Sequence, residues 1–400
     1  MNIALLMHEL ITEGGGERQC VSLARALAQQ GHEVVVYTSA YDPSNCFPEV
    51  CKDLRVIELG RGWWPRLRKP WVLRGYLDMV KMARTVRVRH EIWNPHHWPG
   101  QWAAVWLKSK LGGAVIWMCN DVPNLHEKSQ QAGSIGAIRA AVHRLYYLYD
   151  RAQNRKVDLT MFLSRFAESG FKAIYSGRTA VVRSGADPAR FTPGGDRKKI
   201  RDRFGYQPDE FVLLWLGIFM PHRRLQDAIE ALSQPALRGT KVKLLLAGSG
   251  HVFPEYFNSL KELTVKLGIA DQVVFAGKVE DTEMRDFYCA CDAFIFPNEN
   301  QTWGLAVLEA MACGRPVLVS TGAAVHEVLT DREDAILFPA RDPVSLAEKI
   351  KTLINGAALR DEIAQRGMQL VREKYNYDRF ARDVSGLCSK LLEKKPTLRS

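Results

Sequence analysis

The stretch DAFIFPNENQTWGLAVLEAMACGRPVLVS (292–320) decides the fold class, because it places a helical pattern between two apolar runs. Both runs are continuous rather than alternating, which is typical of parallel strands covered on both faces. We expect a helix from about Trp303, with an apolar stripe formed by Leu305, Leu308 and Ala312. Glu309 falls on the same stripe. A carboxylate in that position must be paired, or must meet a ligand that offers hydrogen-bond donors.

The same alternation of apolar runs and amphipathic segments continues along the whole chain. Further strands are expected at 2–8, 33–39, 114–119, 159–164, 180–184, 211–217, 242–248 and 272–277. This pattern predicts an α/β protein made of two doubly wound, Rossmann-like domains that face a central cleft. The Gly/Pro/Asp-rich stretch 184–196 is the expected hinge. The expected parts are therefore an N-terminal domain (1–190), a C-terminal domain (191–375) and a terminal helix (376–400) that packs back on the N-terminal domain.

Composition restricts the class of protein. The chain has 400 residues, of which 46% are hydrophobic and 25% charged, as in soluble two-domain proteins. No apolar run is long enough to span a bilayer, and the start lacks a basic signal region, so we expect a cytoplasmic location. The eight cysteines show neither a CxxC pair nor a spacing suited to zinc, so we expect reduced, mostly buried thiols and no bound metal.

The net charge of +11 is unevenly distributed. The segment 61–90 holds nine Lys/Arg residues and one Asp, and tryptophans are interleaved with the cations. The candidate membrane or acceptor contacts are Trp63, Trp64, Arg66, Arg68 and Lys69. Such a segment is suited to an anionic membrane surface, where indoles reach headgroup depth and cations meet lipid phosphate. The alternative is a solvated basic face over core tryptophans. No nucleic-acid module accompanies the segment, so nucleic acid is not an expected partner.

Two features are suited to phosphate. Gly14–Gly16 separate the first expected strand from the first helix, where a bare backbone can approach an anion. In the second half, a strand ends at Gly217, and Arg223 and Arg224 precede the next helix. Two guanidinium groups at the carboxyl edge of a sheet could hold a diphosphate with forked hydrogen bonds. A flexible turn and ordinary surface arginines are the alternatives.

The loop before Glu309 completes the candidate site. Gln301 lies eight residues before Glu309, across the expected start of the helix. Glu309 could then accept hydrogen bonds from ribose hydroxyl groups. An ionised phosphate has no hydrogen to donate to a carboxylate. The alternative is that Glu309 pairs internally with an arginine.

These motifs resemble the family 4 retaining glycosyltransferases of the GT-B architecture, and the resemblance covers nearly the whole chain. The segments that carry it are GGGERQCVSLARALAQQGHEVVVYT, VVRSGADPARFTPG, LLLAGSG, VVFAGKV and WGLAVLEAMACGRPVLVS. A second, shorter resemblance, in YTSAYDPSNCF and WWPR, is to the mannosyltransferases that extend lipid-linked oligosaccharides.

The resemblance implies that a nucleotide sugar binds the C-terminal domain and an acceptor binds mainly the N-terminal one. It places Glu309 at the ribose and Gln301 near the donor sugar, where the family has a first glutamate. Arg223 matches the family's phosphate-binding lysine. The remaining donor-binding positions that it implies are Gly15, Gly16, Gly217, Trp303, Gly304 and Leu305.

The chain departs from the family pattern at three places. Gln301 replaces a glutamate, unless Glu299 takes that role. Ile218 stands where the family has an arginine, which leaves Arg224 as a substitute. Asn120 replaces a histidine, although an amide can still hydrogen-bond a sugar hydroxyl. These changes indicate a variant mechanism or a reduced activity.

The expected function follows from the resemblance together with the absence of a DxD motif. We expect a metal-independent, retaining hexosyltransferase without a cofactor, in which arginines and helix dipoles stabilise the leaving phosphate. The expected reaction moves mannose from GDP-mannose to a polyprenyl-linked or other lipid-linked glycan at the cytosolic face of a membrane. The alternatives are a UDP-sugar enzyme with a soluble acceptor, and a non-catalytic partner that binds sugar nucleotide or glycan. The sequence leaves the nucleobase, sugar, linkage and oligomeric state open.

Overall fold

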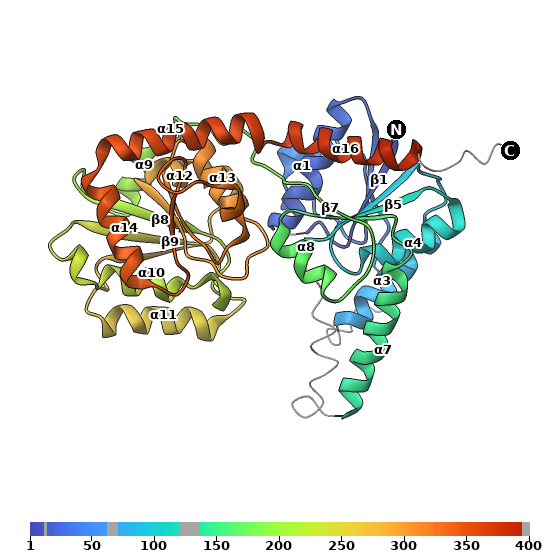
Figure 1. Ribbon diagram of the computed structural model, residues 1–400, viewed down its shortest axis with the longest axis horizontal. Coiled ribbons are helices and arrows are strands. Elements are labelled where there is room, and N and C mark those ends of the chain that lie inside the picture. The colour runs from blue at the N-terminus through green and yellow to red at the C-terminus, as the bar shows by residue number, and fades with distance from the viewer. Residues whose placement is uncertain (12–13, 62–70, 121–136, 394–400) are drawn as a thin grey trace. The chain divides into compact units, whose positions relative to one another are not determined.

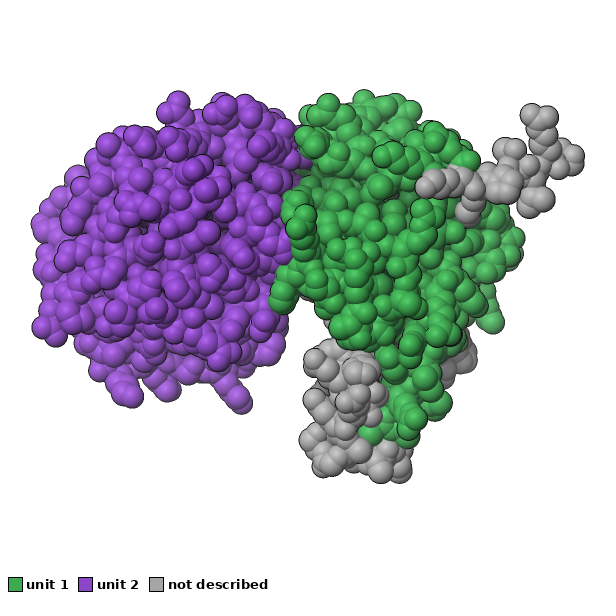
Figure 2. Space-filling view, in the orientation of Figure 1, with its two compact units in different colours: residues 1–183, 377–400 green, residues 184–376 purple. Residues whose placement is uncertain are grey.

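The computed structural model describes residues 1–11, 14–61, 71–120 and 137–393. The chain divides into two compact units, shown in Figure 2. Unit 1 contains Met1–Arg183 and Tyr377–Ser400, and unit 2 contains Ser184–Asn376. Among the described helices, none combines the length and the apolar character that a membrane span needs.

Unit 1 is built on a seven-stranded sheet in the order β3-β2-β1-β4-β5-β6-β7 (Figure 1). The strands are β1 (Asn2–Met7), β2 (Glu33–Thr38), β3 (Val56–Glu58), β4 (Ile92–Pro95), β5 (Ala114–Met118), β6 (Leu159–Phe162) and β7 (Thr179–Val181). Every neighbouring pair is parallel, and Ile3 of β1 lies opposite Val34 on one side and Ile92 on the other. The chain therefore leaves the central strands at one common edge.

Helices cover the two faces of this sheet. They are α1 (Gly15–Gln29), α2 (Pro48–Cys51), α3 (Trp71–Thr85), α4 (Gly100–Leu111), α7 (Ala137–Asn154), α8 (Arg165–Lys172) and α16 (Tyr377–Glu393). Large side chains such as Trp93, Trp117 and Phe162 are fully buried between sheet and helices. The last helix, α16, packs beside α1, where the Gln30 side chain donates to the Asp378 carbonyl at 2.9 Å.

Unit 2 has a six-stranded parallel sheet in the order β10-β9-β8-β11-β12-β13. Its strands are β8 (Phe211–Leu216), β9 (Val242–Ala247), β10 (Val273–Gly277), β11 (Ala293–Phe296), β12 (Val317–Ser320) and β13 (Ile336–Phe338). Its helices are α9 (Arg197–Arg203), α10 (Leu225–Leu232), α11 (Pro254–Lys266), α12 (Met284–Ala290), α13 (Leu305–Ala312), α14 (Pro343–Asn355) and α15 (Ala357–Lys374). Short 3₁₀ segments are η1 (Pro221–Arg223), η2 (Pro235–Leu237), η3 (Asp281–Glu283) and η4 (Ala324–Val328).

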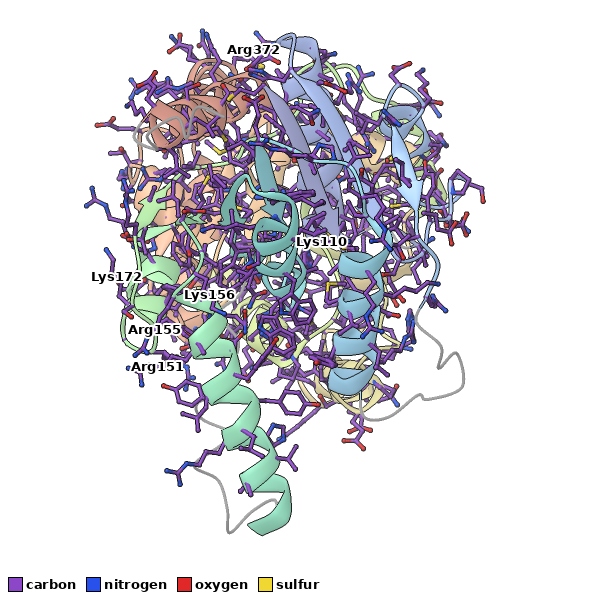
Figure 3. The ribbon with its side chains drawn as sticks, turned by 90° about the vertical axis from the view of Figure 1, so that its right-hand side faces the viewer. Lys110, Arg151, Arg155, Lys156, Lys172 and Arg372 are labelled. Carbon is purple, nitrogen blue, oxygen red and sulfur yellow. The ribbon has the colours of Figure 1, made fainter. Side chains whose placement is uncertain are left out.

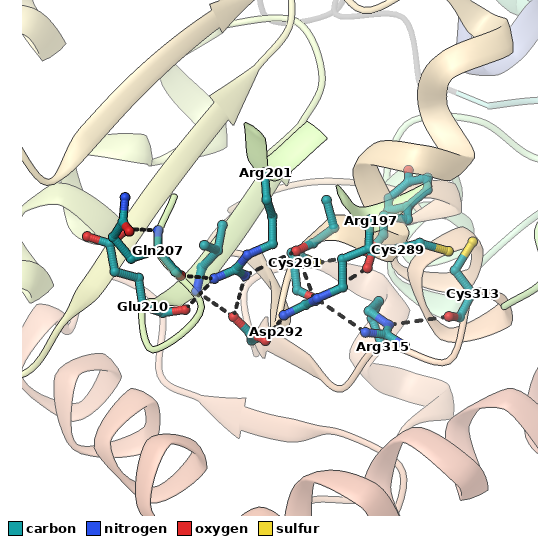
Figure 4. Close-up of polar contacts among 12 residues, drawn as sticks. Arg197, Arg201, Gln207, Glu210, Cys289, Cys291, Asp292, Cys313 and Arg315 are labelled. Carbon is teal, nitrogen blue, oxygen red and sulfur yellow. Dashed lines mark hydrogen bonds and ion pairs between the residues drawn. The ribbon is translucent and has the colours of Figure 1, made fainter. Parts of the chain in front are cut away.

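An arginine network fastens α9 to the amino-terminal end of this sheet (Figure 4). Asp292 accepts from Arg197 at 2.7 Å, from Arg201 at 3.2 Å and from the Val212 backbone N–H at 2.8 Å. Arg201 also donates to the carbonyl groups of Gln207 and Glu210. The network lies at the start of β8 and β11, away from the carboxyl edge of the sheet, so its role is structural.

The expected fold class is confirmed, because both sheets are parallel and carry helices. Three short strands were not expected: β3, β4 and β13. Only β4 exceeds three residues, and its sequence IWNP contains an asparagine and a proline, both unfavourable in strands. All eight cysteines are buried and none forms a disulfide, as expected.

Candidate active site

The carboxyl edge of the unit 2 sheet offers bare backbone. Gly248 follows β9 with φ +142°, and a Cβ atom there would lie 1.7 Å from the carbonyl oxygen of Gly217, which follows β8. Only glycine fits at position 248, because the two strand ends approach so closely. The predicted donor-binding Gly217 therefore lies where the backbone of two strand ends meets, beside the Trp215 ring.

The two predicted phosphate-binding arginines are in different environments. Arg224 adopts a left-handed backbone conformation, with φ +52°, immediately before α10. Its guanidinium donates to both carboxylate oxygens of Asp227, at 3.0 and 2.7 Å, and Asp227 is buried. A phosphate would have to compete with this carboxylate for Arg224. Arg223 ends η1 and is half-buried, as Arg224 is.

The loop after β11 holds Gln301 by its backbone. The Ala324 N–H donates to the Gln301 carbonyl at 2.9 Å. The Glu299 carboxylate accepts from Arg341 through both oxygens at 2.9 Å, and the Glu299 N–H donates to the His222 carbonyl. Since Glu299 is paired in this way, the structure gives no sign that it substitutes for the glutamate that Gln301 replaces.

Helix α13 begins at Leu305, two residues later than expected, and contains Glu309, the predicted ribose acceptor. Gly304 precedes it, and a Cβ atom there would lie 2.8 Å from Val325 Cγ1. Gly304 at the N-cap supplies no side-chain hydrogen bond to the first turn, in which the Val307 N–H donates to the Gly304 carbonyl at 3.1 Å. Backbone N–H groups at the start of a helix suit an anion. Trp303 is buried, with its ring 6.5 Å from that of Tyr375.

Glu309 is only 4% exposed, in agreement with its place on the apolar stripe. Its Oε2 accepts a hydrogen bond from the Tyr288 hydroxyl at 2.8 Å. Tyr288 belongs to α12 and is fully buried. Sequence reasoning missed this tyrosine, because no spacing rule relates a residue of one helix to a residue of the next. The hydroxyl compensates part of the cost of burying a carboxylate and fixes its orientation.

In unit 1, the predicted glycines lie against a histidine. Gly14 precedes α1 without a side-chain cap, and Gly15 begins the helix. A Cβ atom on Gly16 would lie 2.1 Å from His97 Nε2. His97 follows β4 in a left-handed conformation, with φ +64°. The start of α1 and the end of β4 therefore meet at the carboxyl edge of the sheet, where the sequence predicted a phosphate contact.

Several buried polar atoms gather at this edge of unit 1. Those without a hydrogen-bond partner among the described residues are both side-chain heteroatoms of Gln19 and of Asn120, the Ser39 hydroxyl and Nδ1 of His96. Ser39, His96 and Asn120 follow β2, β4 and β5 respectively. Burial lowers the pKa of His96 to about 3, so the ring is neutral. Unsatisfied buried polar groups are rare in folded proteins, and their clustering at one edge indicates a site for a polar ligand.

His8, Glu9 and Asp78 form a neighbouring cluster of residue types that bind cations. Nearby arginines, however, cancel the negative charge that a cation site needs. The three side chains lie within 4.8 Å of one another. Arg74 and Arg61, however, donate to Glu9 at 2.5 and 3.1 Å. These arginines already neutralise the carboxylates, so the cluster is an ion-pair network. The predicted membrane contacts Trp63, Trp64, Arg66, Arg68 and Lys69 lie outside the described residues.

Comparison with known proteins agrees with this division of the chain. A family model for "Glycosyltransferase Family 4" matches residues 13–190, and one for "Glycosyl transferases group 1" matches residues 196–370. The two models together match nearly the whole chain. The chain belongs to the group 1 glycosyltransferases.

Relatives and solved structures agree with this assignment. A D-inositol 3-phosphate glycosyltransferase of Geodermatophilus obscurus is 29% identical over 369 residues, covering 85% of this chain and 78% of the relative. Sucrose-phosphate synthase of Thermosynechococcus elongatus superposes with a TM-score of 0.79 at 20% identity, over 98% of this chain and 99% of that one. Anabaena HepE in complex with UDP-glucose gives 0.77 at 17% identity, over 98% and 100%. The two structures show that this glycosyltransferase has the two-sheet GT-B fold.

Proposed function

We propose that this glycosyltransferase transfers a hexosyl group from a nucleoside diphosphate sugar that binds at the carboxyl edge of the unit 2 sheet. Two observations carry the proposal. The backbone is bare at Gly217 and Gly248, and the start of α13 has no side-chain cap. Further along α13, Glu309 is held in place by the Tyr288 hydroxyl. A diphosphate needs close backbone approach and N–H donors, and a ribose needs an acceptor. The UDP-glucose complex of the Anabaena neighbour supports a donor of this class.

Each residue would contribute to breaking one bond and forming another. Arg223 and the N–H groups of the first turn of α13 would stabilise the leaving diphosphate as the bond from the anomeric carbon to its oxygen breaks. Glu309 would accept from the ribose, and the Gln301 amide would hold the donor sugar. The acceptor hydroxyl forms the new bond from the leaving-group side, and the departing phosphate takes its proton. The expected outcome is retention without a metal ion.

The acceptor would bind at the carboxyl edge of unit 1. There the Asn120 amide and neighbouring polar atoms have no partner among the described residues. A sugar hydroxyl or an acceptor phosphate could satisfy such groups. These residue types fit a hydroxyl-rich acceptor better than an apolar one.

Two acceptor classes are supported by different observations. Mannose transfer from GDP-mannose to a lipid-linked glycan is supported by the resemblance in 37–47 and by the basic tryptophan segment. Transfer to a phosphorylated polyol or sugar, with UDP-glucose among the donors, is supported by the relative that is named for inositol 3-phosphate. We place the lipid-linked acceptor first, because an anionic lipid surface would complement the net charge of +8 in the segment 61–90.

A donor panel tests the proposal. Release of nucleoside diphosphate is measured from GDP-mannose, UDP-glucose and UDP-galactose, with a polyprenyl-diphosphate glycan, with inositol 3-phosphate and without acceptor. We expect one donor to give release that an acceptor stimulates. Stimulation by inositol 3-phosphate alone would replace the lipid acceptor with the soluble one. Donor binding without turnover under all conditions would favour the non-catalytic alternative that the changes at Asn120, Ile218 and Gln301 raise.

A further inference from the structure

Helix α7 exposes an apolar stripe that no described part of the chain covers. Ala141, Leu145, Leu148 and Ala152 follow one another at i, i+4, i+7 and i+11, so they share one face of the helix. All four are exposed, and Leu145 and Leu148 are 68% and 50% accessible. A leucine stripe normally faces a core. Here it faces away from the core of its own unit and therefore needs another explanation.

A basic stripe runs directly beside the apolar one. Arg144, Arg151 and Arg155 are spaced at i, i+7 and i+11 and are exposed, and Lys156 follows. None of these four cations forms an ion pair with a described residue. Figure 3 shows Arg151, Arg155 and Lys156 near the upper end of α7. The helix thus presents leucines and arginines side by side, without an exposed carboxylate among its residues 140–154.

The buried side of α7 fixes this orientation. Asp150, the only carboxylate of the helix, is fully buried on the opposite face. It accepts five hydrogen bonds, whose donors are Trp98, Gln101, Trp102, Asn154 and Tyr175. Asn154 belongs to α7 itself, but the other four donors lie outside the helix. Rolling the helix to bury Leu145 and Leu148 would break these four bonds to the carboxylate, and such bonds are among the stronger hydrogen bonds in proteins. The exposed stripe is therefore built into the fold of unit 1.

We infer that α7 docks unit 1 on an anionic lipid surface, with Leu145 and Leu148 entering the boundary between headgroups and acyl chains. An apolar stripe next to a basic one is the pattern of interfacial helices, in which cations meet lipid phosphates. In Figure 1 the helix extends past the sheet of unit 1. A nucleic acid would use the arginines but not the leucines. A second copy of the chain would set two like-charged arginine stripes close together.

This inference deepens the lipid-acceptor proposal by naming a docking surface, and it does not require that any sugar be transferred. Two exposed leucines and two arginines on α7, with two more cations directly after its end, bind weakly and reversibly, as is usual for a single anchoring element. Binding should therefore depend on lipid charge and fall with salt.

Vesicle binding by the full chain tests it. Sedimentation is measured with vesicles of phosphatidylcholine alone and with phosphatidylglycerol added, at low and high salt. Two double variants of α7 are compared, Leu145→Ser/Leu148→Ser and Arg144→Glu/Arg151→Glu. The matched control is Val265→Ser/Lys266→Glu on α11 of unit 2, where Val265 is 70% exposed. Melting temperature and donor-dependent nucleotide release in detergent are measured for each.

We expect binding only to the anionic vesicles, and a fall of at least about tenfold in the partition coefficient for both α7 variants, since each surface cation alone contributes about fivefold. The control should bind like the wild type, and melting temperature and nucleotide release should not change. Unchanged binding by both α7 variants would overturn the inference. A concentration-dependent dimer that the leucine variant abolishes would also overturn it. Tight DNA binding that depends on the arginines, together with vesicle binding that does not depend on them, would overturn it as well. Nucleotide release without vesicle binding would refute this inference and leave the proposed function standing.

Discussion

At the residue scale, the proposed donor site rests most on Glu309, a buried carboxylate that accepts from the Tyr288 hydroxyl at 2.8 Å. We predict that Glu309→Gln lowers kcat/KM for the donor by about 10- to 150-fold, the value of one hydrogen bond to a charged group. The melting temperature should change little, because the glutamine oxygen can still accept from Tyr288. Donor kinetics and thermal melting of the same preparation check both statements.

Tyr288→Phe is the matched variant for this prediction. It keeps the Glu309 charge but removes the hydroxyl that orients it, so kcat/KM should fall less than in Glu309→Gln, while stability falls by about 1–3 kcal/mol. If Glu309 serves the fold alone, Glu309→Gln should melt much earlier and bind the donor normally. That combination would return the carboxylate to a structural role.

At the element scale, Asp292 binds two arginines of α9, one of them buried. Asp292 accepts from Arg197 and from Arg201, and Arg201 is almost completely buried. We predict that Asp292→Asn lowers the free energy of unfolding by about 3–5 kcal/mol, because it leaves a buried guanidinium without its counter-charge. Asp209→Asn, which breaks the exposed pair with Lys241, is the control and should cost less than about 1 kcal/mol. Equal effects in denaturant titrations of the two variants would show that the network contributes no more than a surface pair.

The elements also show what the sequence could predict. Long apolar runs such as 211–217 and 242–248 identify buried parallel strands, because period and length agree. The orientation of α7 could not be predicted, because a leucine stripe in the sequence looks the same whether it faces a core or the solvent. The four donors to Asp150 that lie outside α7 show which side is buried. The pairings of Arg224 with Asp227 and of Glu309 with Tyr288 likewise depend on side-chain geometry that spacing does not encode.

At the scale of the whole molecule, we predict that the enzyme needs no divalent cation. The sequence has no DxD motif, and the His8, Glu9 and Asp78 cluster is neutralised by arginines. Transfer should survive EDTA within about a factor of two, since arginine and helix N–H groups would carry the charge stabilisation that a metal ion supplies elsewhere. Activity that EDTA abolishes and Mn²⁺ or Mg²⁺ restores would refute the arginine clamp.

The central claim is that the nucleotide binds at the carboxyl edge of the unit 2 sheet. Hydrogen–deuterium exchange of the full chain, with and without saturating nucleoside diphosphate, tests this claim most directly, because bound ligand slows the opening of the backbone that it contacts. We predict slower exchange in peptides covering 217–224, 248–252 and 301–309, and unchanged exchange in α9 and α16. Protection confined to unit 1, or no protection in any of the three unit 2 peptides, would contradict the account.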